Sequence, residues 1–276
     1  MLKKYGLMFL MLVMAASLMV GCGGKDDEDD ENGDDDKPAL VKFVPKGDEG
    51  NVAGVIKFDG EIPALGKIDM SQDPNCASAA GDKTVDDVVV EAGKLANAFV
   101  YLKDGPTTKF SFDTPGEPAV LDQQGCRYVP RILGMVTGQT LRVLNSDPTT
   151  HNVHPSPRLN QEWNKSQPPN AAPIEAKFNK AETLVPIKCN QHPWMKANVG
   201  VLAHPFFAVS VKDGTYSIKG VPPGSYTLVA WHEKFGEQQQ KVTVGANQSL
   251  TQDFTYSAKK AYAATSLRVE PAVVLP

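Results

Sequence analysis

The feature that most constrains the fold is a succession of short segments rich in Val, Ile, Phe, Tyr and Thr, separated by Gly, Pro, Asn or Asp. In the clearest pair, Tyr216–Lys219 alternates apolar with polar residues, and Pro222-Pro223-Gly224 joins it to Tyr226–His232. Helical periodicity is scarce. Because breaks roughly every ten residues are typical of antiparallel sheets, the pattern predicts an all-β protein of one or two β-sandwiches.

The predicted strands cover most of the chain after residue 50. They are Val52–Phe58, Thr84–Val90, Ala98–Leu102, Val129–Val136, Gln139–Leu144, Pro173–Phe178, Leu184–Lys188, Val199–Ala203, Ala208–Val211, Tyr216–Lys219, Tyr226–His232, Gln240–Val244 and Thr251–Tyr256. Two stretches lack a strand pattern: Pro155–Pro173, which holds five Pro, and the tail after Tyr256.

The first residues predict export. Lys3 and Lys4 precede an apolar stretch, Leu7–Val20, which is too short to cross a hydrocarbon core about 30 Å thick as a permanent helix. The sequence Leu18-Met19-Val20-Gly21-Cys22 resembles a bacterial lipobox. That resemblance implies cleavage before Cys22, a lipid on its sulfur, and an exported lipoprotein that faces the periplasm or the cell surface.

Charge is concentrated next to this anchor. The chain has 28 Lys and Arg against 32 Asp and Glu, but residues 38–276 carry 24 basic and 23 acidic side chains. Residues 25–37 read KDDEDDENGDDDK, which cannot bury apolar surface and predicts an extended tether within residues 22–50. The near-neutral remainder has no cluster of Lys and Arg, so nucleic acid is excluded as a partner.

The cysteines predict one disulfide and one functional thiol. If Cys22 carries lipid, three cysteines remain in an oxidising compartment. Cys189 has a His three residues on and a Met three further, in Cys189-Asn190-Gln191-His192-Pro193-Trp194-Met195, whereas Cys76 and Cys126 have no neighbour at ligand spacing. We therefore expect a Cys76–Cys126 disulfide.

A second motif lies upstream, where two predicted strands between Arg131 and Asp147 lead to His151-Asn152-Val153-His154. Together with the Cys-x2-His-x2-Met loop, this segment resembles the cupredoxins, and the loop is similar to that of amicyanins. The resemblance covers roughly residues 95–205 and implies a Greek-key β-sandwich with one type 1 copper ion. It implies the ligands His151, Cys189, His192 and axial Met195.

The resemblance also implies roles for their neighbours. Asn152 is expected to hydrogen-bond across to the ligand loop and orient the sulfur of Cys189. His192 is expected to reach the surface within an apolar patch that includes Trp194, which would make these two residues the electron port. Simple core packing is an equal alternative for Trp194.

The donor types point to copper independently, because two imidazoles, a thiolate and a weak thioether serve Cu(I) and Cu(II) almost equally. Zinc is a weaker candidate, since a thioether is a poor zinc ligand. His154 stays open as an alternative to His151. No G-x-S-x-G motif is present, and His204 and His232 are too few for a multicopper enzyme, so we expect no enzymatic activity.

Residues after Val209 resemble the carboxypeptidase regulatory-like, transthyretin-like β-sandwich modules of exported proteins. The expected domains are a signal peptide (1–21), the lipidated tether (22–50), a copper domain with an N-terminal β extension (51–205), the smaller β module (206–257) and a tail (258–276). One alternative pairs residues 51–102 with 209–256 in a single sandwich. His204 and His232 are expected to have structural roles.

The expected function is one-electron transfer between redox partner proteins in the cell envelope. Two alternatives stay open: a copper-binding or copper-delivery protein that uses the same residues, and a carbohydrate- or surface-binding protein with a secondary copper site. The C-terminal module is the expected contact with a glycan or envelope surface.

Overall fold

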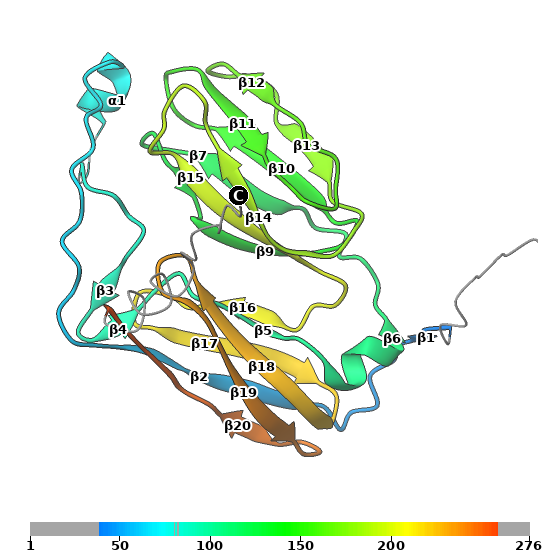
Figure 1. Ribbon diagram of the computed structural model, residues 1–276. Helices are drawn as coiled ribbons and strands as arrows, with labels where there is room; N and C mark the ends of the chain where they lie inside the picture. The colour runs from blue at the N-terminus through cyan, green and yellow to red at the C-terminus, as the bar shows by residue number, and fades with distance from the viewer. Residues whose placement is uncertain (1–38, 80, 82, 259–276) are drawn as a thin grey trace, which may run out of the picture. The chain divides into compact units, whose positions relative to one another are not determined.

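Strand pairing arranges the folded part of the chain as two β-sandwiches (Figure 1). The computed structural model describes residues 39–79, 81 and 83–258. The predicted signal peptide, the lipidated Cys22 and nearly all of the tether lie outside these residues. Among the helices within them, none has the length and apolar character needed to span a membrane. The expected all-β class and two-sandwich architecture are confirmed.

The first sandwich is built from residues 119–202. One sheet has the order β12-β11-β14-β15-β9, formed by Lys165–Gln167, His151–Pro155, Glu182–Lys188, Lys196–Leu202 and Ile132–Val136. The other has the order β13-β10-β7-β8, formed by Ile174–Lys177, Thr140–Asn145, Ala119–Gln123 and Tyr128–Val129. Alternate residues of both sheets, such as Leu141, Val143, Val185 and Val199, form one buried core.

The second sandwich joins both ends of the described chain. Its first sheet, β16-β5-β18-β19, is formed by Phe207–Val209, Phe99–Leu102, Gly224–His232 and Gly236–Val244. Its second, β17-β2-β4-β3, is formed by Thr215–Val221, Gly50–Asp59, Lys94–Leu95 and Val90–Glu91, and β20 (Ser249–Thr251) and β21 (Phe254–Ser257) also pair with β2. The sequence analysis placed residues 51–102 in the expected domain 51–205, but the strands of this segment pair with those of residues 207–257.

The two sandwiches meet through aromatic side chains. Phe99 of β5 and Phe207 of β16 lie in a third apolar cluster with Ile132 of β9 in the first sandwich. Gly134 and Gly200 are cross-strand partners in that sheet, and a Cβ at either would lie within 2.4 Å of the Phe207 or Phe99 ring. Glycine at this pair therefore lets the rings reach the sheet backbone.

A cap segment, which we define as residues 68–79, packs against the first sandwich. Its base is closed where Lys67 pairs with Thr84, and its one helix, α1 (Pro74–Ser78), begins after the N-cap Asp73. Cys76 of α1 is buried and forms the predicted disulfide with Cys126, which confirms that pairing. The disulfide thus ties the cap segment to the first sandwich.

Most predicted strands are present, with one clear exception. Of Thr84–Val90, only Val90 belongs to a strand, β3. Asp86 and Asp87 form ion pairs with Arg131 and Lys234, which explains why this acidic segment does not enter a sheet. The remaining short elements are β1 (Val41–Lys42), β6 (Phe110–Ser111), which pair in parallel, and η1 (Gly105–Lys109).

Candidate metal centre

The loop between β14 and β15 folds back on itself. The two strands are antiparallel neighbours, so residues 189–195 must reverse the chain within one short loop. The N–H of Met195 donates to the carbonyl of His192 at 2.9 Å, and the N–H of Cys189 donates to the carbonyl of Met195 at 3.2 Å. These bonds bring Cys189, His192 and Met195 to one end of the sandwich, and all three are buried.

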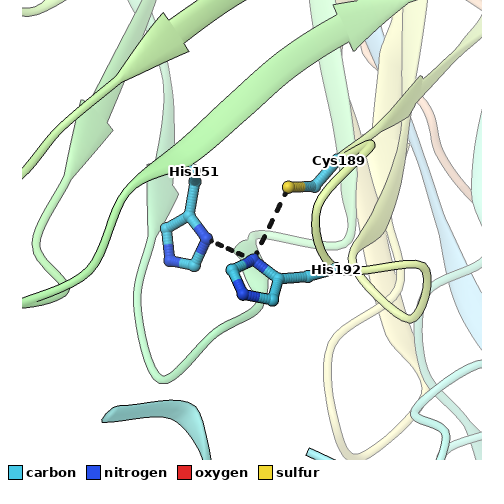
Figure 2. A group of neighbouring side chains, drawn as sticks. All are labelled: His151, Cys189 and His192. Atoms are coloured by element: carbon cyan, nitrogen blue, oxygen red, sulfur yellow. Dashed lines mark hydrogen bonds between the residues drawn. The ribbon is translucent and has the colours of Figure 1, made fainter. Parts of the chain in front are cut away.

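His151 comes to the same place from a neighbouring strand. It begins β11, which pairs with β14 directly before the ligand loop. The Nδ1 atoms of His151 and His192 face one another at 2.9 Å, and the Sγ of Cys189 lies 3.7 Å from Nδ1 of His192 (Figure 2). One donor atom from each of the three residues lies within 4.8 Å of the others.

Each imidazole turns its other nitrogen to a carboxylate. Nε2 of His151 lies 2.8 Å from Oδ2 of Asp147, and Nε2 of His192 lies 3.2 Å from Oδ2 of Asp73. Since a carboxylate can only accept, both Nε2 atoms are the donors. Each Nδ1 can therefore offer a lone pair to a metal ion that lies between the two rings.

The electrostatics of the centre favour a positive charge. Burial lowers the pKa of His151, but its hydrogen bonds to Asp147 and Cys189 outweigh burial and raise that pKa to about 9. Burial and the positive charge of His151 lower the pKa of His192. A single proton thus lies between the two rings in the metal-free chain, at the position that a cation would take.

Cys189 is prepared to act as a thiolate. It is the free cysteine among the described residues, and it is 2% exposed. Burial raises the pKa of its thiol, but hydrogen bonds from His151 and from backbone groups of the loop outweigh burial and lower it. A thiolate is the form in which cysteine binds metals.

Asn152 links the two parts of the centre, as the sequence predicts. Its Oδ1 accepts the N–H of Asn190 at 2.7 Å and the thiol of Cys189 at 3.3 Å. Its own amide donates to Asn164 at 2.7 Å. The side chain is therefore fixed, and it fixes the sulfur of Cys189 in turn.

His154, the alternative to His151, lies outside the cluster. Its ring bonds Asn190 at 3.1 Å and Glu162 at 2.5 Å, and it points away from Cys189 along the alternation of β11. His204 and His232 also lie elsewhere, buried in the second sandwich. His204 lies 2.9 Å from the carbonyl of Leu102, and His232 stacks on Phe235.

The expectation that His192 reaches the surface is wrong. The side chain is buried, with 5% of the residue exposed, because Asp73 and the sulfur of Cys76 lie against its outer nitrogen. Trp194 is half-buried, its ring centre lies 5.1 Å from that of His192, and its Nε1 donates to the carbonyl of Cys126 at 3.0 Å. Trp194 therefore lies at the outer side of the centre, where His192 was expected.

Sequence reasoning missed both carboxylates. Asp147 lies four residues before His151, a spacing that could have indicated it. Asp73 is 119 residues away from His192 along the chain and stands beside no motif. In two further groups, potential metal-ligating atoms also lie close together, and each group includes Cys76 or Cys126. Both cysteines form the disulfide, and a disulfide sulfur is not a thiolate ligand.

Residues 190–257 match the family model of the carboxypeptidase regulatory-like domain. No protein with a curated description matches the chain.

Similar solved structures include the M98A mutant of amicyanin in its Cu(I) form, at 22% identity and TM-score 0.27, covering 32% of this chain and 86% of that one. Another is the "Novel Purple Cupredoxin from Nitrosopumilus maritimus", at 21% identity and TM-score 0.26, and the match covers 30% of this chain and 98% of that one. A third is a Cu-containing nitrite reductase from Thermus scotoductus, at 16% identity and TM-score 0.28, and the match covers 36% of this chain and 27% of that one.

Proposed function

We propose that this chain is a one-electron carrier that holds a single type 1 copper ion between His151, Cys189 and His192. The thioether of Met195 is the weak fourth ligand. The observation that carries the proposal is the convergence of two Nδ1 atoms and one thiol within 4.8 Å, at a point where the chain favours positive charge. This set of donors is the one that suits copper in electron transfer.

When bound, copper supplies the Cu(I)/Cu(II) couple. The residues supply a cage that suits both states. Nε2 of His151 and Nε2 of His192 donate to Asp147 and Asp73, and Asn152 holds the loop beside Cys189 by accepting the N–H of Asn190. Because the donors are buried and these hydrogen bonds fix the two imidazoles and the loop, none has to move far when the charge of the site changes, which keeps the reorganisation small.

The burial of His192 supports an electron exit through Trp194. Its indole is half-buried and adjoins His192 on the side where Pro193 and Lys196 are exposed. Redox partner proteins would dock over Trp194. A lipid on Cys22 would tether the chain to the cell envelope, and the second sandwich would add surface or glycan contacts of its own.

Copper delivery is the main alternative, and the closure of the site argues against it. Delivery needs a ligand that an acceptor protein can reach, and the outer imidazole is covered by Asp73 and Cys76. A carrier that keeps its ion has no such requirement. The covered imidazole therefore favours electron transfer.

Titration of the metal-free protein with Cu(II) tests the donor set. We expect one equivalent to bind tightly to the wild-type chain, and expect Cys189→Ala to lose tight binding. His154→Ala removes an imidazole that lies outside the cluster and is the matched control, which should bind like wild type. Equal binding by Cys189→Ala and wild type would contradict the proposal.

A further inference from the structure

We propose that Asp73 sets the tautomer of His192 and so orients it for metal binding, and that the disulfide-tethered cap segment holds Asp73 in place. The inference rests on the proposed copper site, since it names a positioning residue for it. Asp73 is not a ligand, because its carboxylate lies on the nitrogen of His192 that faces away from Cys189.

The carboxylate of Asp73 is fixed on both oxygens. Oδ1 accepts the N–H groups of Asn75 at 2.8 Å and Cys76 at 3.2 Å, as the N-cap of α1. Oδ2 accepts the hydroxyl of Thr149 at 2.7 Å and faces Nε2 of His192 at 3.2 Å. Toward Nε2 the carboxylate can only accept a hydrogen bond, so the neutral ring must carry its proton on Nε2 and keep Nδ1 free.

The cap segment gives Asp73 its position. Met70 and Cys76 are buried in the core of the first sandwich, and Cys76 is bonded to Cys126. Asn75 donates to the carbonyl of Pro148 at 3.4 Å, next to Thr149. The segment is therefore anchored on both sides of Asp73, although 119 residues separate Asp73 from His192 in the sequence.

The two halves of the centre share this construction. The N–H of Cys126 donates to Asp147 at 2.8 Å, as the N–H of Cys76 donates to Asp73. One disulfide thus joins the two backbone segments that fix the two carboxylates. Each carboxylate in turn fixes one imidazole.

The variant Asp73→Asn distinguishes a carboxylate that sets the tautomer of His192 from a side chain that only covers its imidazole. Asn is nearly the same shape and is an equally good N-cap, so the cap segment should stay folded. With the amide oxygen on Asn75 and Cys76, the NH2 group would face His192 and donate to Nε2. The ring proton would then move to Nδ1, which is the nitrogen that the metal needs, and Nδ1 of His151 would release its own proton to solvent and accept from His192. Asp69→Asn, in the same segment but exposed and bonded to the N–H of Ser71, is the matched control.

The first measurement needs no metal. Nitrogen NMR of the imidazoles in the metal-free protein should show His192 with its proton on Nε2 in wild type and Asp69→Asn, and on Nδ1 in Asp73→Asn. The same tautomer in wild type and Asp73→Asn would overturn the proposal. Because this result does not depend on copper, it stands apart from any failure of the copper site itself.

The second measurement is the copper dissociation constant, determined by competition with a chelator. We expect Asp73→Asn to bind copper 10- to 100-fold more weakly than wild type, and Asp69→Asn to match wild type. The Cys76→Ser/Cys126→Ser double variant should also bind more weakly, because Asp73 loses its tether. Wild-type affinity in Asp73→Asn would refute the role of Asp73, and wild-type affinity in the double variant would refute the role of the disulfide.

Discussion

The Nδ1 atoms of His151 and His192 lie 2.9 Å apart, and each ring is held in that orientation by a carboxylate on its opposite nitrogen. Neither ring can turn its other nitrogen inward without losing that hydrogen bond. Two lone pairs directed at one another are unfavourable unless a proton or a cation lies between them. The arrangement of these side chains therefore requires a positive charge, either a proton or a metal ion, between the two Nδ1 atoms.

Asp147→Asn should weaken copper binding. In one orientation the amide NH2 opposes the N–H of Gly125, and in the other it opposes the N–H of Cys126 and cannot accept from Nε2 of His151. Loss of such a hydrogen bond behind a metal-binding imidazole costs about 10- to 100-fold in affinity. Competition with a chelator measures the change. Ser146→Ala, at an exposed neighbouring position, should not alter the constant, and an unaltered constant in Asp147→Asn would speak against its role.

Trp194→Leu should slow electron exchange and leave the spectrum of the copper-loaded protein unchanged. The indole adjoins His192 but contributes no donor atom to the centre. Stopped-flow reduction by a small soluble complex gives the rate. Trp163→Leu removes a half-buried indole that also packs on the first core and serves as the control. Equal slowing in both variants, or none in Trp194→Leu, would contradict exit through Trp194.

Gly200→Ala should destabilise the contact between the sandwiches. The new Cβ would lie 2.4 Å from the Phe99 ring, which is completely buried and has no free space to move into. Overpacking of this kind costs about 1–3 kcal/mol of unfolding free energy. Urea denaturation measures it. Gly116→Ala, where nothing lies within 4 Å of the added atom, should stay within about 0.5 kcal/mol of wild type.

The second sandwich should lose stability as the pH falls below 6.5. Burial lowers the pKa of both His204 and His232 from 6.5 to about 4. The unfolded chain therefore binds more protons than the folded chain between these values, so the unfolding free energy rises with pH across this window. Each histidine contributes up to about 1.4 kcal/mol per pH unit.

Urea denaturation of His232→Phe across that window tests this assignment. The variant should show a shallower pH slope than wild type, and the two slopes should agree above pH 6.5, where His232 is neutral in both folded and unfolded chains. The same slope in both proteins below pH 6.5 would show that His232 is not the source.

Much of this could be predicted from local sequence. Strands such as Tyr216–Lys219 have strict alternation, and the ligand loop holds three donors within seven residues, so both signals are contained in a few positions. β11 was not predicted, because His151-Asn152-Val153-His154-Pro155 has almost no β-branched residues. Its strand character comes from pairing with β14.

The cap over the centre could not be predicted for a different reason. Asp73 meets His192 only after the chain has folded, and no spacing in the sequence relates them. The exposed imidazole was expected from the resemblance to cupredoxins, and a segment that precedes the region of resemblance covers it here. The disulfide could be predicted, because Cys76 and Cys126 were the two cysteines without ligand-type neighbours in a chain that the sequence predicts to be exported.

The most direct test of the central claim is the visible spectrum of the copper-loaded protein, recorded together with its voltammetry. We predict an intense thiolate-to-copper band that disappears in Cys189→Ala, and a reversible one-electron wave. A colourless protein with one bound copper ion, or an irreversible wave, would contradict the assignment of this chain as a type 1 copper electron carrier.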